Sequence, residues 1–204
     1  MSLIAFYIEV VRALDEINAP YMLVGAFAGS VYGLTRATYD IDILVDLQEP
    51  HFHALAARFP SPRFYADPDQ MRDSTRMGIM FNLIDSVRGA KADLVPLTRE
   101  PEYRYAFARR MRRTFYDETG EAFEAWCARL EDVIIGKLQA WSEGRSAKHP
   151  NDIYAMLLFL FSGLGHEECD LKYIGARAIR LGPETAELWN ELVERAQRQA
   201  QERQ

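Results

Sequence analysis

Short apolar runs alternate with longer amphipathic stretches along the first half of the chain. Short apolar or alternating runs predict strands, and apolar positions that recur every three or four residues predict helices. The strands expected are 21–24, 40–46, 63–66, 78–84 and 92–97. The helices expected are 2–17, 26–33, 50–58, one that begins at Asp67-Pro68, and one near 100–109. This order predicts a small mixed β-sheet with helices packed on it.

The pattern changes in the second half of the chain. A hairpin is expected from 112–117 and 121–126, around the turn Glu118-Thr119-Gly120. Beyond it the apolar spacing is helical, with helices expected at 130–143, 151–161 and from Pro183 to about Gln204. We therefore predict an α+β (α/β-like) fold with a sheet-containing core at 1–128 and a C-terminal helical subdomain at 129–204 that closes one side of a cleft.

Composition points to a protein with a sizeable core. The chain has 204 residues, 49% of them hydrophobic, which is enough to build one domain with a helical appendage. The first fourteen residues form an amphipathic helix and not a signal peptide, and no apolar run has the length of a membrane span. Cys127 and Cys169 fit reduced thiols. We expect a cytoplasmic protein with no membrane partner.

The net charge of −6 argues against broad, nonspecific binding of nucleic acid. One segment departs from this balance, because arginines alternate with aromatic residues in it. The arginines are Arg104, Arg109, Arg110, Arg112 and Arg113, and the aromatics are Tyr103, Tyr105, Phe107, Phe115 and Tyr116. Such a surface could bind an RNA backbone. We favour the alternative, in which the aromatics are core and the arginines form a solvated face.

Two carboxylates one residue apart, Asp40 and Asp42, form the first candidate site. They lie in the alternating run Asp40-Ile41-Asp42-Ile43, and strand side chains at i and i+2 point to the same face. Two like charges on a half-buried strand need a cation or a proton to be tolerated. Mg²⁺ fits this need, because it takes one or two protein carboxylates and completes its shell with water and phosphate.

The stretch before these acids predicts a phosphate site. Gly25 ends a short apolar strand, and a helix rich in small residues follows from Ala26. A helix start directs unpaired backbone N–H groups at the turn, and Gly25 would let a phosphate approach closely. Ser30, Arg36 and Thr38 could add hydrogen-bond donors.

These residues together resemble a known signature. Gly25, then Arg36-x-Thr38-x-Asp40-x-Asp42 and the apolar Ile43-Leu44-Val45, is similar to the polymerase-beta-like nucleotidyltransferase superfamily. The likeness is closest to the small prokaryotic nucleotidyltransferases that include abortive-infection, type IV toxin enzymes. The resemblance implies a third acid on a later strand, which here is Asp93, in a hairpin whose turn we place at 88–91. It implies that Asp40, Asp42 and Asp93 hold Mg²⁺ or Mn²⁺.

The resemblance extends to the C-terminal half and has one departure. Residues 131–138 and 151–153 resemble the lysine and aspartate motifs of the toxin-type branch. By spacing alone, Lys137 and Asp152 have structural roles. The resemblance implies instead that Lys137 neutralises triphosphate charge, and it leaves Asp152 open. The departure is Ala26, where the family has glycine or serine; Ala26 keeps its N–H but lacks the hydroxyl, and Ser30 lies one helical turn on.

The resemblance implies transfer of a nucleoside monophosphate from a nucleoside triphosphate to an acceptor hydroxyl. Three functions stay open. The first is a toxin-like enzyme with an RNA acceptor, such as tRNA, and a cognate antitoxin protein. The second is an antibiotic-type enzyme that modifies a small molecule. The third is a catalytically lapsed protein of the same fold that binds a nucleotide or a partner, which the alanine at Ala26 motivates.

Overall fold

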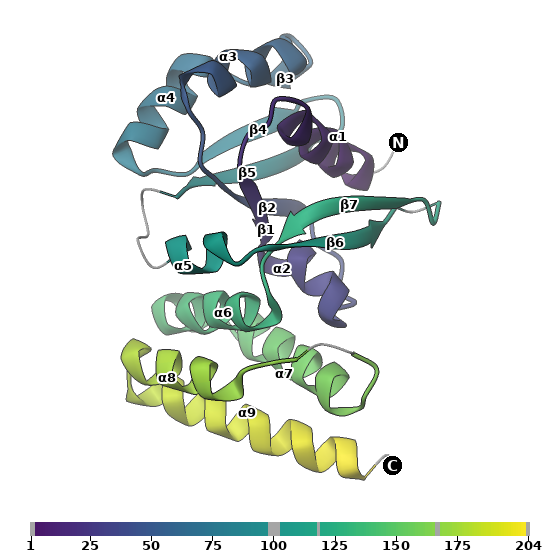
Figure 1. Cartoon of the computed structure of the whole chain (residues 1–204), viewed down its shortest axis with the longest axis vertical. Coiled ribbons are helices and arrows are strands. Elements are labelled where there is room, and N and C mark those ends of the chain that lie inside the picture. The colour runs from purple at the N-terminus through teal and green to yellow at the C-terminus, as the bar shows by residue number, and fades with distance from the viewer. Residues whose placement is uncertain (1–2, 98–102, 118, 166–167, 203–204) are drawn as a thin grey trace. The chain divides into compact units, whose positions relative to one another are not determined.

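The computed structural model describes residues 3–97, 103–117, 119–165 and 168–202, and its chain divides into two compact units. The first unit comprises Met1–Phe27 and Ala37–Cys127, and the second comprises Ala28–Arg36 and Ala128–Gln204. The strands are β1 Tyr21–Val24, β2 Asp40–Val45, β3 Phe64–Tyr65, β4 Phe81–Asp85, β5 Ala90–Pro96, β6 Met111–Tyr116 and β7 Ala122–Cys127 (Figure 1). The helices among them are α1 Leu3–Glu16, α2 Gly25–Gly29, α3 Glu49–Arg58, α4 Pro68–Met77 and α5 Tyr103–Ala108.

The described strands form one seven-stranded mixed sheet in the order β3-β4-β5-β2-β1-β7-β6. Strand β2 pairs with β5 in parallel and with β1 antiparallel, and β1 pairs with β7 in parallel. The predicted α+β class with a mixed sheet is thus confirmed. The β6–β7 hairpin is at one end of the sheet, and β3 with β4 is at the other.

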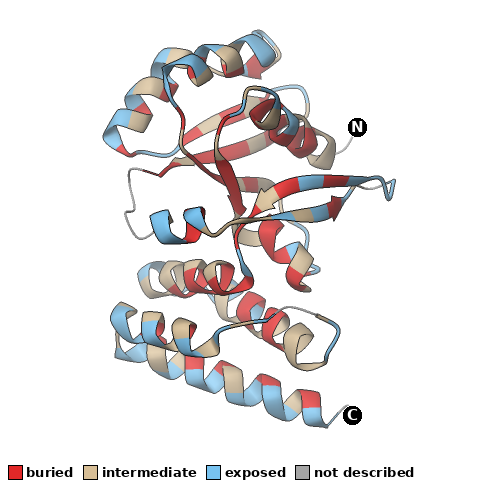
Figure 2. Ribbon diagram, viewed as in Figure 1, coloured by how far each residue is buried: buried red, intermediate tan, exposed pale blue. Residues whose placement is uncertain are grey.

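Strand alternation sets the two faces of the central strands. Ile41 and Ile43 of β2 are fully buried, whereas Asp40 and Asp42 are only partly buried. Buried and partly buried positions alternate in this way along parts of the sheet (Figure 2). Helix α1 contributes an apolar stripe to the same unit, in which Phe6 stacks its ring 6.3 Å from that of Phe64. Burial of such large apolar side chains is the main stabilising contribution to the unit. One face of the strands is therefore committed to the core, and the other carries the acids.

Asp85, at the end of β4, is a fully buried acid with a complete set of partners. Its Oδ2 accepts hydrogen bonds from Arg63 Nη2 at 2.8 Å and Arg88 Nη1 at 3.1 Å. Its Oδ1 accepts from the backbone N–H groups of Val87 and Arg88. Arg88 also binds Glu9 of α1 at 3.2 Å. Burial alone would raise the pKa of Asp85, but these hydrogen bonds hold it below its ordinary value. These hydrogen bonds to Asp85 thus stabilise the turn after β4.

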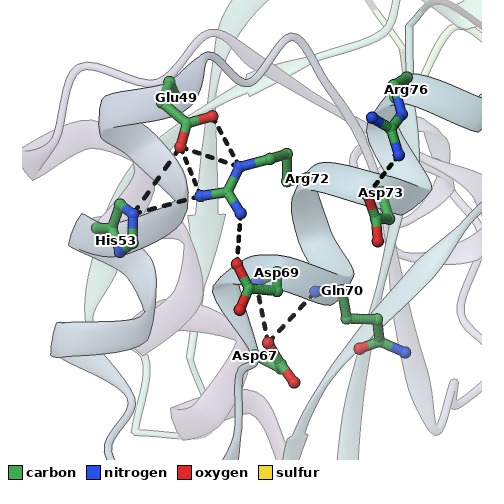
Figure 3. Close-up of polar contacts among 8 residues, drawn as sticks. All are labelled: Glu49, His53, Asp67, Asp69, Gln70, Arg72, Asp73 and Arg76. Atoms are coloured by element: carbon green, nitrogen blue, oxygen red, sulfur yellow. Dashed lines mark hydrogen bonds and ion pairs between the residues drawn. The ribbon is translucent and has the colours of Figure 1, made fainter.

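Helices α3 and α4 are joined by an exposed ionic cluster. Arg72 of α4 donates through Nε to both oxygens of Glu49 on α3, each at 2.9 Å, and it also binds Asp69 (Figure 3). Asp67 caps α4 by accepting from the backbone N–H groups of Asp69 and Gln70, as its position before Pro68 predicts. Because the cluster is exposed, it orients the two helices and adds little stability.

The second unit is helical. Its elements are the short 3-10 helix η1 Ser30–Tyr32 and the helices α6 Leu130–Gly144, α7 Lys148–Phe161, α8 Leu171–Leu181 and α9 Pro183–Gln201. Residues 28–36 belong to this unit, although they precede β2 in the sequence. Tyr32 donates to the Ala128 carbonyl at 2.7 Å, and a side chain added at Gly33 would lie 2.4 Å from Phe159. In the described residues, no helix combines the length and apolarity required to cross a membrane.

Several boundaries differ from the sequence prediction. Strand β4 begins at Phe81, three residues after the start of the strand expected at 78–84. The helix expected at 26–33 breaks after Gly29 into η1, and Gly33 ends that segment with φ of 86°. The turn expected at 88–91 is shorter, because Ala90 and Lys91 are already paired in β5. The sequence analysis gave no bounds for helix α8, which the structure has at Leu171–Leu181. Glu118 of the predicted turn, the expected helix start near 100 and the chain end at 203–204 lie outside the described residues.

Candidate functional site

Asp40, Asp42 and Asp93 lie on one face of two neighbouring strands, and we call them the acid face. Asp42 of β2 is the register partner of Asp93 on β5, and Asp40 is the partner of Lys91. Register partners on adjacent strands point to the same side, as do residues two apart on one strand. The structure therefore brings together the three acids that the sequence analysis singled out.

Gly25 makes room for Asp42. Val24 of β1 is the register partner of Asp42, so the turn after β1 passes directly over that side chain. A Cβ added at Gly25 would lie 2.0 Å from Asp42 Oδ2, which is far inside van der Waals contact, and Gly25 has φ of 67°. Both the space and the backbone conformation thus require glycine here. The close approach predicted for a phosphate is made, in this structure, by a carboxylate.

Thr38, just before β2, orients the carboxylate of Asp40. Thr38 donates from Oγ1 to Asp40 Oδ1 at 2.9 Å, and the same hydroxyl lies 3.1 Å from the Asp40 carbonyl oxygen. This bond fixes the Asp40 carboxylate and uses the hydroxyl that the sequence analysis assigned to phosphate. The role of Thr38 in phosphate binding stays a prediction, and its contact with Asp40 is the role that the structure describes.

Asp93 is the most buried of the three acids, and both of its oxygens have donors. Lys91 Nζ lies 2.8 Å from Asp93 Oδ2, and Asn82 Nδ2 lies 2.5 Å from Oδ1. Lys91 is raised in pKa by its hydrogen bond to Asp93 and by the charges of Asp93, Asp40 and Asp42, against the effect of burial. Its ammonium therefore stays protonated and compensates part of the charge of the acid face.

The acid face fits a divalent cation by its chemistry. Three carboxylates lie on one sheet face, where Lys91 pairs with Asp93, and carboxylate oxygens are the ligands that Mg²⁺ and Mn²⁺ prefer. As the side chains lie, no three acidic, histidine or cysteine residues in the described part of the chain are grouped tightly enough to hold an ion. Asp93 is turned to Lys91 and Asn82 instead. An ion that uses Asp93 as a ligand would therefore share its oxygens with these donors or replace one of them.

The three carboxylates of the acid face also affect the phenol of Tyr7 on α1. Its side chain is buried, and its hydroxyl has no hydrogen-bond partner among the described residues. Burial raises the pKa of Tyr7 to about 12, with further contributions from the carboxylates Asp40, Asp42 and Asp93. The phenol thus stays neutral, and the negative potential of the acid face extends to α1.

The second unit holds a separate cluster with the opposite charge, which we call the cationic cluster. Asp152 of α7, 2% exposed, accepts from Arg36 Nε at 2.7 Å, from Arg36 Nη2 at 2.8 Å and from Lys137 Nζ at 2.6 Å. Burial would raise the pKa of Asp152, but hydrogen bonds from Arg36 and Lys137 hold it below its ordinary value. Lys137 is itself buried. The roles of Lys137, Arg36 and Asp152 toward a nucleotide stay predictions.

His149 adds a neutral group to the cationic cluster. Burial lowers the pKa of His149, and the charges of Lys148, Lys137 and Arg36 lower it further, while Asp152 opposes them. Its Nδ1 is buried without a hydrogen-bond partner among the described residues. Of the other predicted binding residues, Ala26 is half-buried in α2, and Ser30 is exposed at the start of η1.

The arginine segment agrees only in part with the interpretation that we favoured. Phe107 and Phe115 are buried in the core, but Tyr105 and Tyr116 are largely exposed. The arginines Arg104 and Arg112 are exposed, and the others are only partly exposed. Arg110 lies over the rings of Phe107 at 4.2 Å and Trp126 at 5.0 Å, and Arg109 lies over Tyr105. Arg112 pairs with Asp15 at 3.1 Å. The guanidinium groups thus cover aromatic rings and pair with an acid inside the first unit.

Sequence reasoning missed Lys91 and Asn82, which contact Asp93, and the pairing of Arg36 with Asp152. The signal for Lys91 was present. Strand β5 begins at Ala90, two residues before the start of the strand expected at 92–97. Because side chains two residues apart in a strand point to the same face, Lys91 lies on the face of Asp93. No local signal connects Arg36 with Asp152, because 116 positions separate them in the sequence.

Neither a protein-family model nor a curated protein sequence matches the chain. Solved structures do. The enzyme ANT(2")-Ia in complex with adenylyl-2"-tobramycin has 14% identity and a TM-score of 0.50 over 89% of this chain and 97% of that one. An antigenic nucleotidyltransferase-like protein from Paracoccidioides brasiliensis has 14% identity and a TM-score of 0.49, over 89% of this chain and 88% of its own. A protein from H. pylori that has been assigned as a nucleotidyltransferase has 15% identity and a TM-score of 0.48, over 99% of this chain and 96% of its own. The chain therefore has a nucleotidyltransferase-like fold.

Proposed function

We propose that this protein is a nucleotidyltransferase that uses a divalent cation, Mg²⁺ or Mn²⁺, to transfer a nucleoside monophosphate from a nucleoside triphosphate to an acceptor hydroxyl. The observation that carries the proposal is the acid face. Asp42 and Asp93 are register partners on adjacent strands, Asp40 is two residues from Asp42, and Gly25 is shaped around the Asp42 carboxylate. Such a group of like charges on a partly exposed face is costly unless a cation binds it.

In this reaction the acceptor oxygen attacks the α-phosphorus, the bond between the α-phosphorus and the bridging oxygen breaks, and pyrophosphate leaves. Asp40 and Asp42 would hold the ion, with Asp40 kept in place by Thr38. Asp93 would complete the ligand set and accept the proton of the attacking hydroxyl. When bound, the ion supplies electrophilic stabilisation of the phosphoryl oxygens.

For phosphate contacts we propose two sources, each within its own unit. The backbone N–H groups that follow Gly25 would bind phosphate oxygens. In the cationic cluster, the Arg36 side chain is 41% exposed, and its guanidinium group would bind phosphate oxygens.

Two candidate functions differ in the acceptor of the nucleoside monophosphate. A toxin-like enzyme would label an RNA such as tRNA and would have a cognate antitoxin partner. A small-molecule acceptor is the second candidate. It is favoured by the fold similarity to ANT(2")-Ia, whose solved complex contains adenylyl-2"-tobramycin.

The test is label transfer from each of the four α-labelled nucleoside triphosphates. The protein is incubated with Mg²⁺ or Mn²⁺ and either total RNA or an aminoglycoside, and wild type is compared with Asp42→Asn and Asp93→Asn. We expect label on one acceptor class with wild type and on neither with the variants. Absence of label on both acceptors, with nucleotide still bound, would favour the lapsed binder instead.

A further inference from the structure

Lys91 is the group that occupies Asp93 in the structure. Its ammonium lies 2.8 Å from Asp93 Oδ2, and the amide of Asn82 lies 2.5 Å from the other oxygen. Both carboxylate oxygens are therefore engaged by donors that come from the sheet itself. An ion that needs Asp93 as a ligand must share these oxygens with the donors or replace one of them.

The two donors differ in how easily they can leave. Asn82 has a short side chain that is fixed on β4 opposite Asp93. Lys91 has a long, flexible stem, and its side chain is 41% exposed, against 8% for that of Asp93. The ammonium can therefore move into water by a rotation of its stem, while Asp93 stays in place.

The positive charge of Lys91 also opposes the binding of a cation at the acid face. It is the register partner of Asp40 and two residues from Asp93, so its ammonium stands on the acid face itself. A divalent ion at the same carboxylates would be repelled by a unit positive charge only a few ångströms away. A neutral side chain at this position would remove that repulsion and would leave Asp93 without its ion pair.

We propose that Lys91 is a built-in counter-cation that a divalent ion must displace from Asp93 before the acid face becomes a complete metal site. This inference rests on the proposed function, because it concerns the same site. The side chain therefore weakens binding of the free ion and stabilises the ion-free protein. It is a positioning residue, and it is not a ligand of the ion.

The test is Mn²⁺ binding to the full chain, measured by calorimetry and by the electron paramagnetic resonance signal of free Mn²⁺. Lys91→Gln and Lys91→Met are compared with wild type, and Met keeps the length of the stem. We expect both variants to bind Mn²⁺ roughly three- to tenfold more tightly. Lys91→Arg, which keeps the charge, should bind like wild type. Lys172→Gln, at an exposed position of the second unit, should also leave affinity unchanged.

Thermal unfolding gives a second measurement. In a chelator, both neutral variants should unfold at a lower temperature than wild type, because the acids lose their counter-charge. Saturating Mn²⁺ should remove this difference. Equal or weaker Mn²⁺ binding by both neutral variants would overturn the inference and leave the proposed function standing. Absence of Mn²⁺ binding by wild type and variants alike would overturn both.

Discussion

Asp85 and Asp93 stand on neighbouring strands of one sheet, and their charges are compensated in opposite ways. Asp85 is fully buried and receives hydrogen bonds from two arginines and two backbone N–H groups, and with Glu9 its network contains as many acids as arginines. Asp93 has one lysine, which also faces the charges of Asp40 and Asp42. The charges around Asp85 are thus balanced within its own network, whereas Asp93 belongs to the group of acids that we propose as the cation site.

The largest expected effect is that of Gly25→Ala on nucleotidyl transfer. A Cβ at this position would lie 2.0 Å from Asp42 Oδ2, so the substitution displaces an acid of the acid face. We expect transfer to be abolished. The control is Gly89→Ala, because Gly89 has φ of 63° and no atom within 4 Å of an added Cβ. That variant isolates the backbone strain, about 1 kcal/mol, and should keep its activity. Equal activity of both variants would contradict the role given to Gly25.

Asp152→Asn should have the next largest effect, on stability. The substitution leaves the buried Lys137 and the adjoining Arg36 without their carboxylate, which we expect to cost about 3 kcal/mol of unfolding free energy at neutral pH. The pKa of Asp152 is below its ordinary value in the folded state, so its stabilisation is present above the unfolded pKa of about 3.9 and is lost as the pH falls through the folded value.

Denaturant unfolding at several pH values measures this difference. Wild type should lose stability as the pH falls below about 4, and Asp152→Asn should lose less over the same interval. Parallel curves for the two proteins would show that Asp152 does not carry this part of the acid sensitivity.

A matched pair, Asp85→Asn and Asp42→Asn, compares the two kinds of acid directly. Removing the Asp85 charge leaves Arg63 and Arg88 without their shared acceptor charge, and we expect a loss of about 2 kcal/mol. Removing the Asp42 charge relieves repulsion among like charges, so the ion-free protein should change by about 1 kcal/mol or less, in the stabilising direction. Chemical denaturation in a chelator measures both. Similar losses for the two variants would contradict the distinction between the two kinds of acid.

Tyr7→Phe should have the smallest effect. The Tyr7 hydroxyl is buried and has no hydrogen-bond partner in the described part of the chain, so its removal deletes an unsatisfied polar group. We expect the unfolding temperature to stay constant or rise slightly. A clear destabilisation would mean that the hydroxyl has a partner, such as a bound water, near the acid face.

Much of the first unit could be predicted from sequence because its signals are local. The alternation Asp40-Ile41-Asp42-Ile43 predicts a strand with acids on one face, and the structure has that strand at Asp40–Val45. The capping pair Asp67-Pro68 predicts the start of α4. The turn before β5 was predicted too long, because Gly89 and Lys91 suggest a turn, whereas pairing with β2 and β4 extends the strand back to Ala90.

The candidate site was predictable only in part. The three acids, Gly25 and the cationic residues follow from the residue pattern and the resemblance that it carries. The partners of these residues did not follow. In the structure Arg36 binds Asp152, and Thr38 donates to Asp40, while their roles toward phosphate stay predictions. A sequence identifies which side chains can donate or accept, and it does not identify which of the available groups they meet.

The sequence by itself determined the class of the fold, the strand that carries Asp40 and Asp42, and the helical character of the second half, because periodicity and capping act within a few residues. Only the tertiary structure decided that Asp93 aligns with Asp42, that Lys91 compensates it, and that residues 28–36 pack with the helices of the second unit. Strand register and burial depend on contacts between segments distant in the chain. The charge balance that distinguishes a structural acid from a ligand-binding one is set by those contacts.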